Sequence, residues 1–221
     1  MKLSSCGLWA IGYGLAGFSA LPVQSPDAAA IVRRAGLVFR NLTSLQADFV
    51  QAIQDPSLGD TLRTTGRLYQ AGPNAFAMRF SDPPEEAIVI DGTHVWLYFP
   101  STTPGQVIRM RMETDPVYGA NLLARILDRP AERYQSTWLR SDTVGGRRVD
   151  VVSIVPRADN LNFSKAVLWL DRDEALPRRI ELEESAGVRR ILTLSQVRPN
   201  ASVDKTVFEF RVPRGVRVVD Q

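Results

Sequence analysis

The sequence predicts a mainly β protein: an incomplete antiparallel β-barrel of about eleven to twelve strands, with helices covering its open hydrophobic side. Three observations support this. The chain has 221 residues, which suits one globular domain. From residue 62 onward, apolar and polar residues alternate with period two between regularly spaced turn residues. Only two segments have helical periodicity, too few to cover both faces of a flat sheet, so the sheet must curve on itself.

The first predicted element is an amphipathic helix over residues 27–41. Apolar residues recur there at three- and four-residue spacing, and Asp27 is a suitable N-cap. The stretch that begins at Leu45 suits either a continuing helix or one face of a strand. Because Thr43 and Ser44 offer a natural break, we favour a strand.

Strands account for most of the remaining chain. The dipeptide Asp91-Gly92, between two apolar runs, is the strongest hairpin signal. Because the connections are short, the sheet is expected to be mainly antiparallel. After the strand from Leu45, strands are expected at residues 62–70, 75–81, 87–90, 93–99, 106–112, 135–141, 147–155, 164–170, 178–184, 189–197 and 206–212.

One helix interrupts this series of strands. Asp115 is a suitable cap, Pro116 falls in the first turn, and apolar residues recur as far as Leu127, before Pro130. A helix in this position would lie over the open side of the curved sheet.

The N-terminal segment has the features of a secretory signal peptide. Lys2 is followed by an apolar run over residues 6–21 and by small residues at 28–30. A run of about 16 residues is shorter than the roughly 20 that a transmembrane helix needs. We expect a signal peptide within residues 1–30, cleaved between about residues 25 and 30, and a half-barrel domain over residues 31–221.

The composition argues against common enzyme chemistries. The chain has one cysteine, Cys6, and one histidine, His94. A single cysteine cannot form an intrachain disulfide, and zinc or general acid–base sites usually draw on more of these residues. We therefore expect no enzymatic activity, no catalytic residues, no metal and no cofactor. The net charge of +3 comes with acidic residues beside the arginine pairs, so no nucleic-acid partner is expected.

Two further features could carry chemistry. Any Ser/His/Asp site would have to use His94, but the sequence has no G-x-S-x-G elbow. Asp171, Asp173 and Glu174 cluster in a turn that lacks the glycine and downstream glutamate of a calcium loop. An ordinary strand-end histidine and a solvated turn are the favoured interpretations.

Large, adaptable side chains occupy one face of several strands. Phe76, Met78 and Phe80 alternate with smaller or charged residues, and Trp96 and Tyr98 alternate with Val95 and Leu97. Methionine and aromatic residues suit an irregular apolar cavity that can repack around a flexible guest. They also suit a plain hydrophobic core, and the pattern alone leaves both interpretations open.

Four segments, in order behind the predicted signal peptide, resemble the periplasmic outer-membrane lipoprotein carrier (LolA) family. They are LQADFVQ at 45–51, GRL at 66–68 leading to PNAF at 73–76, IDGTHVWLY at 90–98 and FEFRVPRGV at 208–216. The similarity runs from about Ala29 to Val219. It implies an incomplete antiparallel barrel whose hydrophobic cavity is covered by helices.

The resemblance also implies a function and a set of residues. A carrier of this family takes acylated lipoproteins from the inner-membrane ABC transporter that releases them. It shields their acyl chains across the periplasm and delivers them to the outer membrane, where an outer-membrane receptor is a further expected partner. We expect a monomer. Carried over by position, the lipid-binding cavity would be lined by Phe39, Phe49, Phe76, Met78, Trp96 and Tyr98, and the lid helix would carry Leu122, Leu123 and Ile126.

One departure from the family pattern affects the lid. The family commonly has Arg-Pro before the Asn-x-Phe segment, and that arginine ties the sheet to the lid, whereas this chain has Gly72-Pro73. The resemblance therefore leaves two alternatives. Either the lid latch is missing, or Arg67 or Arg79 supplies it.

Two other functions are weighed against the carrier. A lipid-sensing or regulatory periplasmic domain of the same half-barrel fold would read a lipid or an exported signal. Such proteins usually add a second domain or an anchor, and this chain ends just after the last predicted strand. A hydrolase would depend on His94. The carrier is the favoured interpretation.

Overall fold

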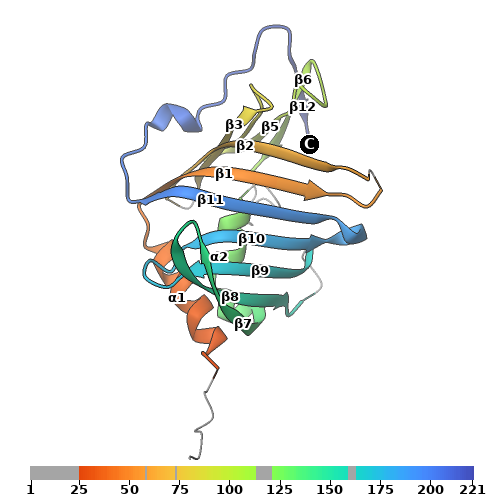
Figure 1. Ribbon diagram of the computed structural model, residues 1–221. Coiled ribbons are helices and arrows are strands. Elements are labelled where there is room, and N and C mark those ends of the chain that lie inside the picture. Colours follow the sequence, from red (N-terminus) through yellow and green to blue (C-terminus); the bar gives the residue numbers. More distant parts are fainter. Residues whose placement is uncertain (1–24, 58, 73, 113–120, 159–162) are drawn as a thin grey trace, which may run out of the picture.

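The computed structural model describes residues 25–57, 59–72, 74–112, 121–158 and 163–221. Twelve described strands form one sheet in the order β12-β6-β5-β4-β3-β2-β1-β11-β10-β9-β8-β7 (Figure 1). The strands are β1 Ser44–Gln54, β2 Thr61–Ala71, β3 Ala75–Asp82, β4 Ala87–Asp91, β5 His94–Tyr98, β6 Gln106–Arg111, β7 Tyr134–Val144, β8 Arg147–Pro156, β9 Phe163–Asp171, β10 Pro177–Glu184, β11 Arg189–Pro199 and β12 Arg217–Asp220.

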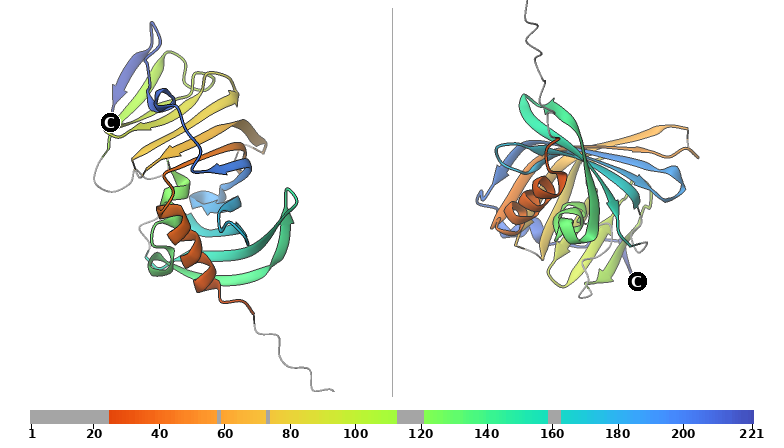
Figure 2. Two further views of the ribbon diagram at one scale, coloured as in Figure 1. Left: turned by 90° about the vertical axis from the view of Figure 1, so that its left-hand side faces the viewer. Right: turned by 90° about the horizontal axis from the view of Figure 1, so that it is seen from below.

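The sheet curves but does not close, since β12 and β7 remain its two edges (Figure 2). Neighbouring strands are antiparallel, with the exception of β12, which runs parallel to β6. The predicted incomplete antiparallel barrel is therefore confirmed. The predicted hairpin is confirmed too, because Asp91 ends β4 and Gly92, with a φ of +96°, begins the turn that leads to β5.

Three helices lie on the concave side of the sheet (Figure 2). Helix α1 spans Ala28–Arg40, and Asp27 caps it by accepting hydrogen bonds of 2.9 and 3.1 Å from two backbone amides of its first turn. Helix α2 spans Leu122–Leu127 and helix α3 spans Pro130–Arg133. The first predicted helix is confirmed.

The structure revises the second predicted helix. Its predicted cap and first turn, Asp115 and Pro116, lie outside the described residues. Within the described residues, Asn121 caps α2 by accepting a hydrogen bond of 3.0 Å from the amide of Ala124. The sequence pattern did not predict α3, in which Pro130 occupies the first turn, where its missing N–H costs nothing.

Helix α1 packs closely against the other two helices at a glycine. A β-carbon added to Gly36 would lie 2.6 Å from Cδ of Pro130 and 2.9 Å from the carbonyl oxygen of Leu127. Any larger residue at position 36 would therefore push α1 away from the turn between α2 and α3.

Apolar clusters lie on both faces of the sheet. The concave face carries one, and the convex face carries a small one around Trp169 and a larger one, which we call the convex cluster. The concave cluster joins α1 and α2 to inward residues of the sheet such as Phe49, Phe76 and Leu168. The convex cluster contains Trp96 and Tyr98 and is covered by residues from the C-terminal segment. Aromatic residues in this cluster point away from the concave side of the sheet.

The predicted strand at residues 206–212 is wrong. Lys205–Phe208 form a 3-10 helix that Asp204 caps through the amide of Thr206, and the chain then crosses the convex face before β12. The period-two pattern predicts a strand here. Instead, Phe208 and Phe210 pack against the convex face of the sheet, and the segment forms no strand.

Candidate binding cavity

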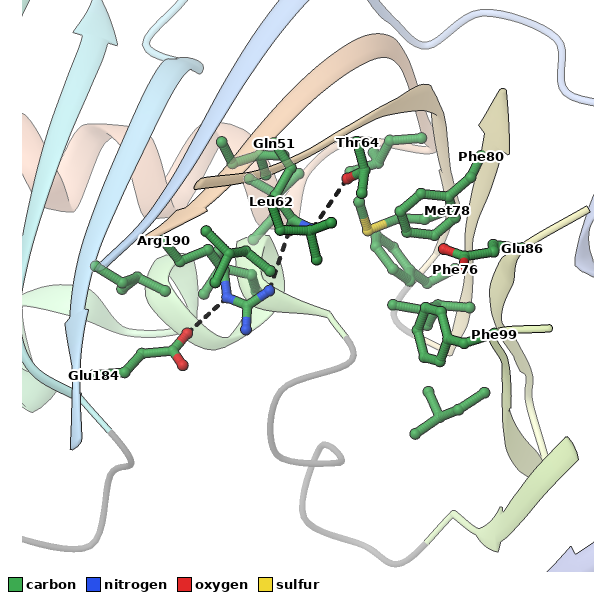
Figure 3. A pocket seen from close by; sticks show the side chains of 18 of the residues that line it. Gln51, Leu62, Thr64, Phe76, Met78, Phe80, Glu86, Phe99, Glu184 and Arg190 are labelled. Atoms are coloured by element: carbon green, nitrogen blue, oxygen red, sulfur yellow. Dashed lines mark hydrogen bonds and ion pairs between the residues drawn. The ribbon is translucent and has the colours of Figure 1, made fainter. Parts of the chain in front are cut away.

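A cavity of 450 Å³ lies between the concave face of the sheet and α2 (Figure 3). This volume is in the range of small-molecule sites. Most of its lining is apolar and comes from β1–β6, α2 and β9–β11. The apolar lining residues are Ile53, Leu62, Leu68, Phe76, Met78, Phe80, Pro83, Ile88, Leu97, Phe99, Met110, Leu122, Leu123, Phe163, Leu182 and Leu192.

Cross-strand register places this lining on one face. Met78 of β3 lies opposite Ile88 of β4, Ile88 lies opposite Leu97 of β5, and Leu97 lies opposite Ile108 of β6. Directly opposite residues project to the same side of a sheet, so three of these four residues line one continuous wall.

Phe49 supports this wall from within the core. Its ring meets Phe80 edge to face, with centroids 5.2 Å apart and planes at 83°. A β-carbon on Gly66 would lie 2.9 Å from the Phe49 ring and 2.2 Å from the carbonyl oxygen of Arg79. The glycine therefore lets the Phe49 ring pack closely against β2.

The structure brings several of the predicted site residues together. Phe76, Met78, Leu122 and Leu123 line the cavity. The others lie in the surrounding core, where Phe39 of α1, Phe49 of β1 and Ile126 of α2 are buried. Their part in holding a guest remains a prediction.

Trp96 and Tyr98 lie elsewhere, and their predicted place in the cavity is wrong. They alternate with Val95 and Leu97 as expected, but it is Leu97 that faces the cavity. Trp96 stacks on Phe210 of the C-terminal segment, with centroids 5.3 Å apart. Period-two alternation identifies two faces without telling which is concave, and the aromatic residues lie on the convex one.

Asp91 holds Trp96 in this position. The indole Nε1 donates a hydrogen bond of 2.8 Å to Asp91 Oδ2, while the amides of Thr93 and His94 and the Thr93 hydroxyl donate to Oδ1. Partial burial would raise the pKa of Asp91, but these four hydrogen bonds outweigh it and lower the pKa to about 2.

Among the described residues, neither predicted latch arginine contacts α2, so that prediction is corrected. Arg67 pairs with Asp48 on the convex face at 2.7 Å. Arg79 donates hydrogen bonds to the carbonyl oxygens of Val207 and Glu209, so it fastens the C-terminal segment to β3. Both arginines alternate with concave residues along their strands, which points their side chains outward.

Other contacts tie the lid helix to the sheet. The Tyr134 hydroxyl donates a hydrogen bond of 3.0 Å to the carbonyl oxygen of Arg125. Asn121 contacts Gln70 of β2, with Nδ2 and Oε1 3.5 Å apart, and Gln70 in turn donates to the carbonyl oxygen of Gly72. This chain has Gly72 where the family commonly has arginine. The side-chain amides of Asn121 and Gln70 connect the lid to the turn at Gly72.

A row of polar side chains crosses one end of the cavity, and we call Glu184, Arg190, Gln51 and Thr64 the polar row (Figure 3). Arg190 Nε donates to Glu184 at 2.6 Å, Arg190 Nη1 donates to Gln51 Oε1 at 3.3 Å, and Gln51 Nε2 donates to Thr64 Oγ1 at 3.3 Å. Sequence reasoning missed this row, because Gln51 and Arg190 are 139 residues apart and only the pairing of β1 with β11 joins them.

The acidic turn is a structural ion-pair network. The Asp171 side chain is fully buried and receives hydrogen bonds from Arg147 at 2.8 Å and Arg178 at 3.0 Å. Burial would raise the pKa of Asp171, but the arginines and the backbone amides of Asp173 and Glu174 lower it far below its usual range. No group of three or more candidate metal ligands occurs in the described parts of the chain.

His94 has an ordinary environment at the start of β5. Its Nδ1 lies 2.9 Å from the Thr93 hydroxyl, and its ring lies beside Trp96 on the convex side, away from the cavity. Among the residues placed by the structure, no helix is long and apolar enough to cross a membrane.

The sequence matches a known family over most of its length. The family model described as "Outer membrane lipoprotein carrier protein LolA" matches residues 40–211. An outer-membrane lipoprotein carrier protein of Methylobacillus flagellatus is 27% identical over 183 residues, which cover 83% of this chain and 85% of the relative. One of Alkalilimnicola ehrlichii is 27% identical over 204 residues, covering 91% and 89%.

Solved structures share the fold at low sequence identity. An uncharacterized conserved protein from Thermus thermophilus has a TM-score of 0.56 at 14% identity, covering 88% of this chain and 99% of that protein. A chain of the Pseudomonas aeruginosa MucA/MucB complex has a TM-score of 0.51 at 17% identity, covering 88% and 64%. These likenesses support the half-barrel architecture alone.

Proposed function

Because this chain belongs to the LolA family of outer-membrane lipoprotein carriers, we propose that it binds the acyl chains of lipoproteins released from the inner membrane and delivers them to the outer membrane. The observation that carries this proposal is the apolar cavity under a short helical lid. An acyl chain needs such shielding because each methylene transferred from water to an apolar site contributes roughly 0.8 kcal/mol.

A short lid helix suits a carrier that must also release its cargo. Within the described residues, α2 is six residues long, and the hydrogen bonds from Tyr134 and Asn121 tie it to the sheet. A small energy gap between closed and open states lets a membrane transporter or receptor shift the equilibrium without nucleotide hydrolysis by the carrier. The proposed partners are the lipoprotein-releasing ABC transporter of the inner membrane and an outer-membrane receptor.

The proposed compartment is the periplasm, reached through a signal peptide in residues 1–30. Cleavage is proposed between about residues 25 and 30, releasing the half-barrel domain. Within this window, cleavage before Asp27 keeps the cap of α1, and Ala28 is already buried in the core. N-terminal sequencing of the periplasmic protein tests this part of the proposal, and a mature chain that begins beyond residue 30 would contradict it.

A release assay tests the function itself. Purified protein is added to spheroplasts that are making radiolabelled lipoproteins, and the supernatant is assayed for soluble lipoprotein bound to the carrier. We expect the protein to bring labelled lipoprotein into the supernatant as a one-to-one complex. A supernatant that stays free of lipoprotein at every carrier concentration would contradict the proposal.

A further inference from the structure

The polar row lies on the cavity wall, toward the ends of the strands that carry it. Three of its members lie two residues nearer the strand end than a buried core residue on the same strand face. Arg190 precedes Leu192, Glu184 follows Leu182, and Gln51 follows Phe49. All four lie near the ends of their strands, since β1 and β10 end, and β2 and β11 begin, within three residues of them. The row is thus a polar strip within a mostly apolar lining, since Ile53 and Leu62 continue that lining nearer the strand ends.

Arg190 donates hydrogen bonds to both of its neighbours in this row, and two donor groups of the row remain unused within the described residues. Glu184 orients Arg190, Arg190 donates to Gln51, and Gln51 donates to Thr64. The Thr64 oxygen is therefore an acceptor, and its own hydroxyl hydrogen is left to donate. Arg190 uses Nε and Nη1 in the row, and its Nη2 has no partner among the residues that the structure describes.

These donors face the cavity and are partly shielded from water. Thr64 is 4% exposed, and the side chain of Arg190 is 30% exposed. A hydroxyl in such a place costs free energy unless it finds an acceptor. The row therefore suits a guest that brings oxygen acceptors to these donors and apolar chains to the rest of the lining.

An acylated lipoprotein has this arrangement of groups. Its chains are hydrocarbon, and where they meet the N-terminal cysteine they end in ester and amide carbonyls, which accept but do not donate through oxygen. We propose that the polar row binds these carbonyl groups, with the Thr64 hydroxyl and Arg190 Nη2 as the donors. This inference rests on the proposed carrier function and adds the part of the cargo that the cavity recognises.

Two synthetic ligands separate this inference from simple apolar binding. One is a tripalmitoylated S-glyceryl-cysteinyl peptide, and the other is its analogue with both glyceryl esters replaced by ethers. The two differ by the ester carbonyls and have matched hydrocarbon. Affinities are measured by titration calorimetry with protein purified from the periplasm. We expect the ester ligand to bind about tenfold more tightly, the gain from one or two added hydrogen bonds.

Two variants test which side chains cause the preference for the ester ligand. Thr64→Val keeps the shape of the side chain and removes its hydroxyl, while Arg190→Lys keeps a charge for Glu184 and removes the guanidinium fork. Each is expected to reduce the ester preference to about threefold or less, by losing one donor, because the affinity for the ester ligand falls more than that for the ether ligand. Thr65→Val is the matched control, since Thr65 faces outward and pairs with Ser81, and it should keep the full preference.

The outcomes distinguish failure of the polar-row proposal from failure of the proposed carrier function. Equal binding of ester and ether ligands by the natural protein would overturn the polar-row assignment while supporting an apolar carrier. An ester preference that survives in both Thr64→Val and Arg190→Lys would also overturn it. Failure of the natural protein to bind either ligand would overturn the carrier proposal itself. Thermal unfolding of each variant confirms folding, and Arg190→Lys carries the test if Thr64→Val does not fold.

Discussion

The hydroxyl of Tyr134, the first residue of β7, donates a hydrogen bond of 3.0 Å to the backbone carbonyl oxygen of Arg125 in the lid helix. Both residues are buried, with exposures of 1% and 5%. Burial raises the pKa of Tyr134, against a smaller opposing effect of the positive charges on Arg133 and Arg125, so the phenol stays protonated and able to donate. A short helix is thereby fixed to the sheet at its C-terminal turn.

Removing this bond is expected to loosen the lid. Tyr134→Phe should lower the free energy of unfolding by about 1 kcal/mol, because one buried hydrogen bond is lost without a cavity. Hydrogen exchange of the α2 amides should accelerate correspondingly. Tyr98→Phe is the control, since Tyr98 is also buried but makes no hydrogen bond through its hydroxyl to the residues described. Equal α2 exchange in both variants would argue that the bond does not hold the lid.

A charge on the cavity wall is expected to prevent lipid binding. Leu97 faces the cavity and is only partly buried, so Leu97→Glu should fold yet weaken binding of a triacylated lipopeptide by at least about tenfold. Leu139→Glu makes the same change at a residue that is 43% exposed and away from the cavity, and it should bind normally. Unimpaired binding by Leu97→Glu would place the acyl chains elsewhere.

Hydrogen exchange can separate the roles of Arg79 and Arg67, the two arginines that the family resemblance suggested as latches. Arg79→Gln removes the donors that hold Val207 and Glu209, so residues 200–216 should lose about tenfold in exchange protection while α2 is unaffected. Arg67→Gln loses a half-exposed ion pair with Asp48 and should change neither region. Faster exchange in α2 of either variant would restore that arginine as a latch.

Acid is expected to destabilise the protein through Asp171. Its pKa is lower in the folded state than its ordinary value of 3.8, so it stabilises the fold above about pH 4, and this contribution is lost as the pH falls through the folded-state pKa. Asp171→Asn should cost about 3 kcal/mol at neutral pH, because the buried Arg178 loses one of its two carboxylate partners.

Denaturant titrations from pH 7 to pH 2 check this expectation. Stability of Asp171→Asn should fall less steeply below pH 4 than that of the natural protein. Asp173→Asn, in the same turn but with a 66% exposed side chain, should change stability by no more than about 0.5 kcal/mol. Parallel pH profiles for Asp171→Asn and the natural protein would show that this carboxylate does not set the acid response.

Strand positions were predictable because alternation is a local property. The strands from Leu45 onward and the Asp91-Gly92 hairpin need only neighbouring residues to be recognised. The face that becomes concave depends on distant segments, and Trp96 is convex because Phe210 covers it from the far end of the chain. The failed strand at 206–212 has the same cause, since its carbonyls bind the Arg79 side chain instead of a neighbouring strand.

The cavity could be predicted only in part for similar reasons. The two-residue spacing of Phe76 and Met78 predicts that they share one strand face, and both line the cavity. The polar row could not be found this way, because Gln51 and Arg190 meet only through the register of β1 and β11. A single polar residue in such a strand is usually predicted to face solvent. Its sequence neighbours do not show whether it faces a cavity instead.

Mass spectrometry of the protein purified from the periplasm tests the carrier account most directly. Under conditions that keep complexes intact, we expect a fraction of the natural protein to carry bound lipoprotein or acyl lipid, and a much smaller fraction of Leu97→Glu to do so. A natural protein that is always empty, from cells whose lipoproteins are made normally, would contradict the account.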